Sequence, residues 1–261
     1  MKYGFIGCGN MGGAIARALA RSTNDILLSD PSEKAQLLAN ELSCQCADNV
    51  AVAEQCDRIF LAVKPQVMPN ALAPIAPILA QRKPLIITMA AGLKMERIEE
   101  YIGASVPIIR IMPNTPVAIG KGMILYSCNP LVTESDVKTF LDDMRYAGRL
   151  DRLNEELIDV ASALSGSGPA YMYQFLEAMT DGAVACGLPR EKAIVYAAAT
   201  MEGAAQMLIQ TGADPSKLRD AVCSPGGSTI EGLKALNQKD FCGTVVDCIM
   251  AAYKRNLELG Q

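Results

Sequence analysis

The spacing of hydrophobic residues changes near residue 152. Before it, short apolar runs alternate with segments in which apolar residues recur every three or four positions. The runs predict buried strands and the spaced segments predict helices, and this alternation is typical of a doubly wound, mostly parallel sheet. The expected strands are 3–6, 26–29, 57–63, 85–88, 108–112 and 122–126, and the expected helices are 13–20, 32–42, a proline-interrupted 69–80, and 133–146.

Beyond Asn154 the pattern is that of helices alone. Alanine, methionine and leucine recur at three- and four-residue spacing, with no strand-like alternation. We therefore expect two domains, residues 1–152 and residues 153–261. The expected helices of the second domain are 155–163, 168–186, 190–211, 214–222, 227–236 and 240–259.

The segment from Ile194 to Ile209 in this helical half is apolar almost all round. Such a helix is either central to a core or buried against another subunit. Because a domain of ~110 residues has a limited interior, we expect this segment to form the interface of a homodimer.

The first expected strand runs directly into a turn with the spacing G-x-G-x-x-G, formed by Gly7-Cys8-Gly9-Asn10-Met11-Gly12. Gly7 permits a tight turn, Gly9 has no Cβ to block a pyrophosphate, and Gly12 lets the next helix pack close to its strand. The free N–H groups at the start of that helix then face the phosphates. The turn predicts a dinucleotide-binding domain over residues 1–152, with a purely structural glycine turn as the alternative.

Asp30 follows the second expected strand, 18 residues after Gly12, close to where an acid that contacts the ribose is expected. In a doubly wound sheet, ligands bind at the carboxyl ends of the strands. The strand ends expected at that edge are Gly7, Ala62-Val63-Lys64-Pro65 and Thr88-Met89-Ala90-Ala91-Gly92. These segments are therefore candidate parts of the cofactor site.

Charge and hydropathy disfavour two kinds of partner. The net charge is −4, and no run of lysine or arginine provides the electrostatic footprint of a nucleic-acid binder. The apolar stretch from Ala71 to Ala80 is too short to span a membrane and contains Pro74 and Pro77. We expect neither nucleic acid nor a membrane as a partner.

The cysteines and the N-terminus indicate the compartment. The chain leads directly into a strand, which leaves no room for a signal peptide. The nine cysteines are scattered, and their odd number argues against a fully paired set of disulfides. We therefore expect a cytoplasmic protein with reduced thiols.

The chain contains no histidine. Cys44 and Cys46 form the closest pair of cysteines, but a metal site would need further ligands, so we expect no metal and interpret the pair as small apolar side chains in a strand. The lack of histidine also removes the usual general acid and base of alcohol dehydrogenases. Any chemistry must proceed without imidazole.

A segment rich in glycine and serine joins two expected helices of the second half: Val222-Cys223-Ser224-Pro225-Gly226-Gly227-Ser228-Thr229. Its backbone N–H groups can form a cradle for an anion such as a substrate carboxylate, with the Thr229 hydroxyl left to bond a neighbouring polar atom. The alternative is ordinary, because Ser-Pro can end one helix and Ser228 or Thr229 can cap the next. The residue chemistry alone favours neither.

A second segment of this kind is Leu164-Ser165-Gly166-Ser167-Gly168-Pro169-Ala170-Tyr171. It is either a glycine turn with Pro169 at the first helical position or a place where small residues let a nicotinamide ring approach the backbone. Two such helix openings in one helical domain favour a binding site.

These motifs together resemble the pyrroline-5-carboxylate reductase family, and the resemblance covers essentially the whole chain. It implies a Rossmann domain, a helical dimerisation domain and a small-molecule substrate, L-1-pyrroline-5-carboxylate, reduced to L-proline in the last step of proline biosynthesis by hydride transfer from NAD(P)H. The segments that carry it are 7–12, 62–66, 112–116, 164–171 and 223–229.

The resemblance implies roles for individual residues. Asn49 and the Ala62 to Pro65 loop are expected beside the cofactor, Asn114 near the nicotinamide, and the loop from Ser224 to Ser228 on the substrate carboxylate. Each has a plain alternative, because Asn49 can cap a helix, Lys64 can be a solvated charge and Asn114 can stabilise a turn. The expected cofactor residues are Gly7, Cys8, Gly9, Asn10, Met11, Gly12, Ser29, Asp30, Asn49, Ala62, Val63, Lys64, Pro65, Ala90, Ala91, Gly92 and Asn114; the expected substrate residues are Val222, Ser224, Gly226, Gly227, Ser228 and Thr229, with Thr229 catalytic at the ring nitrogen.

Reduction of an imine suits a chain without histidine. Reduction of a ketone creates an alkoxide that needs a proton donor, whereas hydride addition to a protonated imine neutralises a positive charge and leaves a stable amine. We therefore expect the protein to act mainly through proximity and orientation, with the Thr229 hydroxyl bonded to the ring nitrogen.

The expected cofactor is NADPH, with NADH also accepted. At the ribose, Asp30 would accept hydrogen bonds from a 2′-hydroxyl and repel a 2′-phosphate, which favours NADH. Ser29 and Ser32 flank Asp30 and can donate to a phosphate, and the resemblance implies frequent use of NADPH.

Two other functions are considered. A β-hydroxyacid dehydrogenase has a similar two-domain plan but carries a catalytic lysine after a comparable glycine loop, and Tyr171 to Met179 contains none. A non-catalytic NAD(P)-binding regulator is the other alternative. The resemblance also permits dimers to assemble into a higher oligomer.

Overall fold

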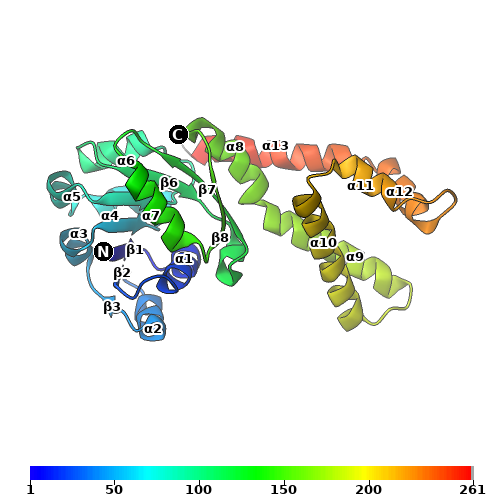
Figure 1. The fold of residues 1–261 in the computed structure, drawn as a ribbon, viewed down its shortest axis with the longest axis horizontal. Helices are drawn as coiled ribbons and strands as arrows, with labels where there is room; N and C mark the ends of the chain where they lie inside the picture. The colour runs from blue at the N-terminus through cyan, green and yellow to red at the C-terminus, as the bar shows by residue number, and fades with distance from the viewer. Residues whose placement is uncertain (260–261) are drawn as a thin grey trace. The chain divides into compact units, whose positions relative to one another are not determined.

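The computed structural model describes residues 1–259. It contains one sheet with the strand order β3-β2-β1-β4-β5-β6-β7-β8 (Figure 1). All neighbouring strands are parallel except β6 and β7, so the doubly wound sheet is confirmed with one reversal. The strands are β1 (Tyr3–Ile6), β2 (Ile26–Ser29), β3 (Gln45–Cys46), β4 (Arg58–Leu61), β5 (Leu85–Thr88), β6 (Ile108–Met112), β7 (Gly122–Cys128) and β8 (Gly148–Arg152).

The helices fall into two groups along the chain, and the chain after β8 is helical, as predicted. Those connected with the sheet are α1 (Asn10–Ala20), α2 (Glu33–Leu42), α3 (Asn49–Gln55), α4 (Met68–Leu72), α5 (Ala76–Arg82), α6 (Met95–Ile102), α7 (Glu134–Met144) and α8 (Glu155–Ser165), with the short 3₁₀ helices η1 (Pro65–Val67) and η2 (Thr115–Ile119). Those that follow are α9 (Gly168–Ala185), α10 (Arg190–Thr211), α11 (Pro215–Ala221), α12 (Ser228–Gln238) and α13 (Phe241–Leu259).

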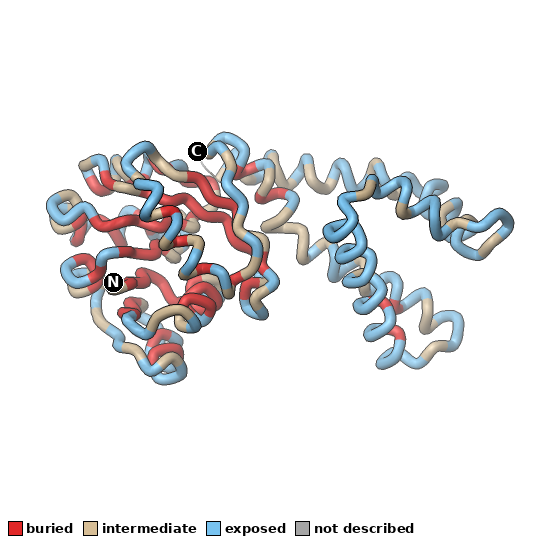
Figure 2. The backbone as a smooth tube through the Cα atoms, in the orientation of Figure 1, coloured by how far each residue is buried: buried red, intermediate tan, exposed pale blue. Residues whose placement is uncertain are grey.

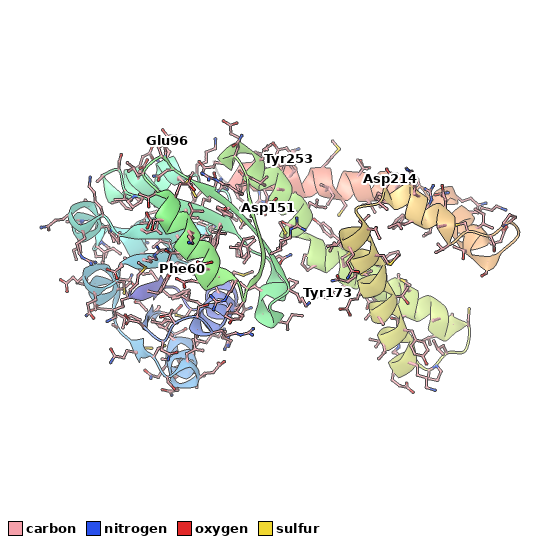
Figure 3. The ribbon with its side chains drawn as sticks, viewed as in Figure 1. Phe60, Glu96, Asp151, Tyr173, Asp214 and Tyr253 are labelled. Carbon is pink, nitrogen blue, oxygen red and sulfur yellow. The ribbon has the colours of Figure 1, made fainter. Side chains whose placement is uncertain are left out.

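Side chains of the central strands alternate between the two faces of the sheet, because successive residues of a strand point in opposite directions. Phe60 of β4, labelled in Figure 3, belongs to the core under α1, α2 and α7. Its ring stacks on that of Phe5, with centroids 4.5 Å apart. Its neighbours Ile59 and Leu61 belong to the core under α3, α4, α5 and α6. Helices therefore cover both faces, as a parallel sheet requires.

Several elements differ from the prediction. The expected 69–80 helix is indeed interrupted, as α4 and α5, but it begins at Met68. Strand β8 was missed because its sequence, Gly-Arg-Leu-Asp-Arg, has no apolar run; it is a half-exposed edge strand paired in parallel with β7. Helices α3 and α6 were missed because segments of 7 and 8 residues give too few turns to establish a helical period.

The chain forms two compact units. One comprises Met1–Pro169 and the chain from Ala251 onward, and the other is Ala170–Met250. The first unit continues past the last strand because α8 packs on the sheet, with Ile158 against Met112 and Leu125. The end of β8 coincides with residue 152, and the division into domains at that position stays a prediction.

The second unit, Ala170–Met250, buries little of its own apolar surface (Figure 2). Thr180, Ala193 and Ala197 are its only buried residues. On α10 the exposed fractions are 60% for Val195 and 63% for Ile209. This helix is therefore not central to a core within the chain, which favours burial against another subunit.

We expect Ile209→Glu to weaken self-association. Full burial of an isoleucine is worth roughly 1.5–3 kcal/mol, and a carboxylate in its place would have to be desolvated in an apolar interface. Sedimentation velocity should show a shift to smaller species. The control is Gln206→Glu, which adds the same charge at a position of α10 that is already polar and exposed. An unchanged assembly in Ile209→Glu would exclude this face of α10 from the interface.

Candidate active site

The turn between β1 and α1 requires glycine at two of its positions, Gly7 and Gly12. Gly7 has a φ of +100°, and a Cβ there would lie 2.8 Å from backbone atoms of Ala62 and Val63. A Cβ at Gly12 would approach the Gly7 carbonyl oxygen to 2.4 Å. These contacts bring the glycine turn directly against the end of β4, so the structure places two of the predicted cofactor segments side by side.

Gly9 is different, because a Cβ built there would meet nothing within 4 Å. It is the N-cap of α1 and makes no side-chain cap, so the first N–H groups of the helix, from Asn10 and Met11 onward, face open space. Packing does not require glycine at this position. The space above Gly9 is available to a ligand, and the helix N-terminus suits a phosphate.

Asp30, at the end of β2, is tied to the same turn. Its Oδ2 accepts a hydrogen bond from the Cys8 N–H at 2.7 Å, and its Oδ1 accepts from the Ser32 N–H and hydroxyl at 2.9 and 2.6 Å. Burial raises the pKa of Asp30, but the hydrogen bonds from Cys8 and Ser32 outweigh it, so that pKa is lowered overall. The carboxylate is therefore ionised and fixed in place.

Ser29 and Asn49 are brought together behind Asp30. The Ser29 hydroxyl donates to Asn49 Oδ1 at 2.6 Å, and Asn49 Nδ2 donates to the Ala71 carbonyl at 3.4 Å. Asn49 does not cap α3, because Asp48 is the N-cap and accepts from the Ala51 N–H at 2.8 Å. The amide of Asn49 instead joins the end of β2 to α4.

A pocket of about 200 Å³ opens beside this turn and contains residues that the sequence analysis missed. The predicted Cys8, Gly9 and Asn10 line it together with Lys34 and Arg17. Arg17 is engaged with Glu41 through two hydrogen bonds of 2.7 Å. Lys34, in the first turn of α2, forms no ion pair within residues 1–259 and lowers the pKa of Asp30 by its charge. The signal in the sequence that could have identified Lys34 is its position, four residues after Asp30.

The Cys8 thiol is buried and poorly suited to act as a nucleophile. Burial, and then the charge of Asp30, raise its pKa to about 12, so the thiol is protonated near neutral pH. All nine cysteines are free. Among the described residues no group of histidine, cysteine and acidic side chains could hold a metal ion. Within the same range, none of the helices is both apolar and long enough to cross a bilayer.

The other strand ends differ in exposure. Lys64 is exposed, and its side chain makes no hydrogen bond or ion pair in the part of the chain that is described, although its main-chain carbonyl accepts from the Val67 N–H at 2.9 Å; Pro65 begins η1. After β5, Ala90 and Gly92 are buried and Ala91 is half-buried, with Gly92 at a φ of +78°. Their expected cofactor contacts stay predictions.

Asn114 joins two of the motifs. Its Nδ2 donates to the Ser165 carbonyl at 2.9 Å, and its Oδ1 accepts from the Met123 N–H at 2.8 Å. The segment after β6 therefore meets the end of α8, within the first unit. Both ends of the amide are used by the protein, as the alternative of a turn-stabilising asparagine requires, and its place near the nicotinamide stays a prediction.

The second unit holds the other glycine and serine segment. Gly226 has a φ of +70°, and Gly227 is the N-cap of α12, so the cap is neither Ser228 nor Thr229. Ser228 and Thr229 are the first residues of the helix, and their N–H groups have no intrahelical acceptor. Thr229 and Ser224 are exposed, and the Thr229 hydroxyl is free among the described residues. Val222, the C-cap of α11, is 67% exposed. This geometry can cradle an anion.

The fold and the glycine turn define a Rossmann-type dinucleotide-binding oxidoreductase domain followed by a helical domain. Two sequence-family models match the chain. The one described as NADP oxidoreductase coenzyme F420-dependent matches residues 2–92, and the one described as pyrroline-5-carboxylate reductase dimerisation matches residues 155–259. The helical domain is thus a dimerisation domain, which supports self-association.

Relatives and solved structures agree with both matches. The pyrroline-5-carboxylate reductase of Escherichia coli K12 is 37% identical, with 100% of this chain and 98% of the relative covered. The pyrroline-5-carboxylate reductase of Arabidopsis thaliana is 36% identical, with 100% of this chain and 96% of the relative covered. A crystal structure of the Plasmodium falciparum pyrroline carboxylate reductase with NADP bound has a TM-score of 0.91 at 32% identity. The match covers 100% of this chain and 98% of the Plasmodium chain. The chain belongs to the pyrroline-5-carboxylate reductase family, whose members are NAD(P)-dependent oxidoreductases.

The predicted family, fold class and enzyme class are therefore confirmed. The β-hydroxyacid dehydrogenase and the non-catalytic regulator gain no support, because the relatives are named as reductases of pyrroline-5-carboxylate. The role of each site residue stays a prediction.

The two glycines of the turn should respond differently to substitution. Gly9→Val should lower the melting temperature only by the small loss of N-cap preference but weaken NAD(P)H binding about 10-fold or more, because the side chain fills the open space expected to hold phosphate. Gly12→Ala should lower the melting temperature, because its Cβ would meet the Gly7 carbonyl oxygen. Fluorescence titration with NAD(P)H and thermal melting separate the two effects. Normal cofactor binding by Gly9→Val would place the pyrophosphate elsewhere.

Proposed function

We propose that this chain reduces L-1-pyrroline-5-carboxylate to L-proline with NADPH, accepting NADH as well, in the last step of proline biosynthesis. The observation that carries the proposal is the pairing, in one chain of this family, of an open glycine turn at the end of β1 with a free serine and threonine helix opening at α12. The first suits a dinucleotide and the second suits a small carboxylate.

The dinucleotide fits the residues present. Open space lies over Gly9, an ionised carboxylate lies at the end of β2, and a free ammonium, that of Lys34, lies beside the same pocket. The α1 N–H groups would hold the pyrophosphate, and Asp30 would contact the ribose. NAD(P)H supplies the hydride when bound.

The α12 opening would hold the substrate. The N–H groups from Gly226 to Thr229 bind the carboxylate, and the Thr229 hydroxyl bonds the ring nitrogen and orients the C=N bond. The ring nitrogen of the protonated imine already carries its proton, so hydride addition leaves a neutral amine that takes its second proton from water. No general acid is needed, which agrees with a chain that has no histidine.

The proposed assembly is a homodimer, and such dimers could assemble further into a higher oligomer. The proposed location is the cytoplasm. The exposed apolar face of α10 and the match to the dimerisation model support self-association. Nine free cysteines suit a reducing compartment.

The function is tested by measuring the initial rate of NADPH oxidation, and separately of NADH oxidation, by the purified protein with pyrroline-5-carboxylate. We expect oxidation that depends on the substrate, with L-proline as the product. Absence of oxidation with both cofactors, in a folded protein that binds NADPH, would refute the proposed reaction.

Thr229→Val should test the catalytic residue. The variant keeps the shape of the side chain but loses its hydroxyl, so we expect kcat to fall roughly 100-fold, with little change in the Kd for NADPH. Thr229→Ser is the matched control, since it keeps a hydroxyl and should keep most of the activity. An equal kcat/KM in Thr229→Val and wild type would remove Thr229 from the mechanism.

Asp30→Asn should increase the preference for NADPH over NADH. The asparagine keeps an oxygen that can accept from the Cys8 N–H but removes the charge that repels a 2′-phosphate, so the ratio of kcat/KM values should shift about 10-fold. Asp30→Ala removes charge and hydrogen bonds together and serves as the comparison, because loss of the turn contact should weaken both cofactors. If the ratio in Asp30→Asn equals that of wild type, Asp30 does not select the cofactor.

A further inference from the structure

A fully buried arginine stands in the middle of the sheet. Arg110 of β6 is 0% exposed. Its Nη2 donates to Asp159 Oδ1 at 2.6 Å and its Nη1 donates to Glu155 Oε1 at 3.4 Å. Glu155 and Asp159 are four residues apart on α8, on the same side of the helix. The planar guanidinium thus holds two carboxylates on the first turns of α8.

Glu155 and Asp159 each contact one further element, Glu155 through its carboxylate and Asp159 through its main-chain carbonyl. Glu155 Oε1 also accepts from the Met95 N–H at 2.7 Å, at the start of α6, where the N-cap Lys94 makes no side-chain cap. The Asp159 carbonyl accepts from Asn256 Nδ2 of α13 at 2.9 Å. Arg110 therefore joins β6 to α8 and, through Glu155, to the start of α6, while the end of α13 contacts the α8 backbone at Asp159, all within the first unit.

Stability does not explain why an arginine occupies this position. Arg110 Nε is buried and has no hydrogen-bond partner within residues 1–259, and such an unpaired donor is unfavourable. A buried ion pair is often no more stabilising than well-packed apolar side chains of the same volume. An arginine does provide direction, because its forked donors set how α8 is rotated and shifted on the strand.

The far end of α8 is held by Asn114, through the hydrogen bond from Asn114 Nδ2 to the Ser165 carbonyl. Arg110 and Asn114 belong to one strand and the turn that follows it, and Asp159 and Ser165 belong to one helix. The two contacts therefore fix α8 near its start and at its end. A rotation of the helix that breaks the first also displaces the second.

We propose that Arg110 is a positioning residue for hydride transfer. Through Asp159 and Glu155 it sets the register of α8 on β6, and so keeps Asn114 and residues 165–168 in place at the carboxyl edge of the sheet. Arg110 pairs with Thr88, the last residue of β5, so the chain that follows it reaches the edge where the cofactor is expected. The inference rests on the proposed function, because the orientation concerned is that of the reduction.

The test is the double variant Arg110→Met with Asp159→Leu. Leucine has the same branching and number of heavy atoms as aspartate, and the double change removes both charges of the Arg110–Asp159 pair. Glu155 also loses its contact with Arg110, but its side chain is 21% exposed and it still accepts from the Met95 N–H. We expect kcat for pyrroline-5-carboxylate reduction to fall about 10- to 100-fold, as a small misplacement of reacting groups does, with an unchanged Kd for NADPH. The kinetic isotope effect with NADPH deuterated at the transferred position should rise, because the hydride step becomes slower relative to the others. A change in stability alone would not raise it.

Arg58→Met is the matched control. Arg58 is a second buried arginine of the sheet, 2% exposed, and it pairs with Asp136 at 3.3 Å. It stands at the start of β4, at the opposite edge from Asn114. The Asp136 side chain is 32% exposed, so water still solvates it after the substitution. We expect kcat and the isotope effect of this variant to equal those of wild type.

Wild-type kcat and isotope effect in the folded double variant would overturn the proposal and leave the Arg110 network a packing role only. If circular dichroism shows that the double variant does not fold, Asp159→Asn decides. It keeps the shape of the side chain, weakens the contact with Arg110, and should lower kcat and raise the isotope effect, whereas wild-type values again overturn the proposal. A wild-type protein that does not reduce pyrroline-5-carboxylate would instead refute the proposed function, so the two failures are distinct.

Discussion

The close approach of the first turn to the end of β4 is the contact on which the candidate cofactor site depends. Any side chain at Gly7 would overlap the backbone of Ala62 and Val63, and any side chain at Gly12 would overlap Gly7 itself. Because these contacts are between main-chain atoms, no rotamer change could relieve them. The absence of two side chains therefore lets α1 start directly over the edge of the sheet, with its N-terminal dipole facing outward.

The electrostatics of the site follow from that placement. The Cys8 N–H, which the tight turn directs at Asp30, helps keep the Asp30 carboxylate ionised despite its partial burial. The same carboxylate raises the pKa of the neighbouring Cys8 thiol. One turn thus presents N–H groups for phosphate, a fixed charge for ribose and an inert thiol. This part of the site is preorganised, so binding need not order it.

The sheet and the glycine turn could be predicted because their signals are local. Apolar runs such as Tyr3–Ile6 and Ile108–Met112 are buried on both faces and read as strands. Strand β8 gave no such signal, since its residues are polar and it is defined by its pairing with β7.

The features of the site that were missed depend on contacts between distant positions. Lys34 joins the pocket because α2 packs beside α1, and the cap of α3 is Asp48 rather than Asn49 because only Asp48 has the extended backbone of an N-cap. In the sequence, Arg110 is a single charge within an apolar strand. Only the fold brings it beside Asp159, which lies 49 positions away. Local patterns carry no information about such pairs.

The scarcity of buried residues between Ala170 and Met250 has a consequence for the folding of the protein. A unit whose own interior comprises Thr180, Ala193 and Ala197 gains little free energy from collapsing alone. The match to the dimerisation model indicates that surface shared with another chain supplies its hydrophobic stabilisation, and folding and assembly of this half would then form one coupled equilibrium. The concentration of the protein then enters its stability directly, and dilution acts on this half as a denaturant would.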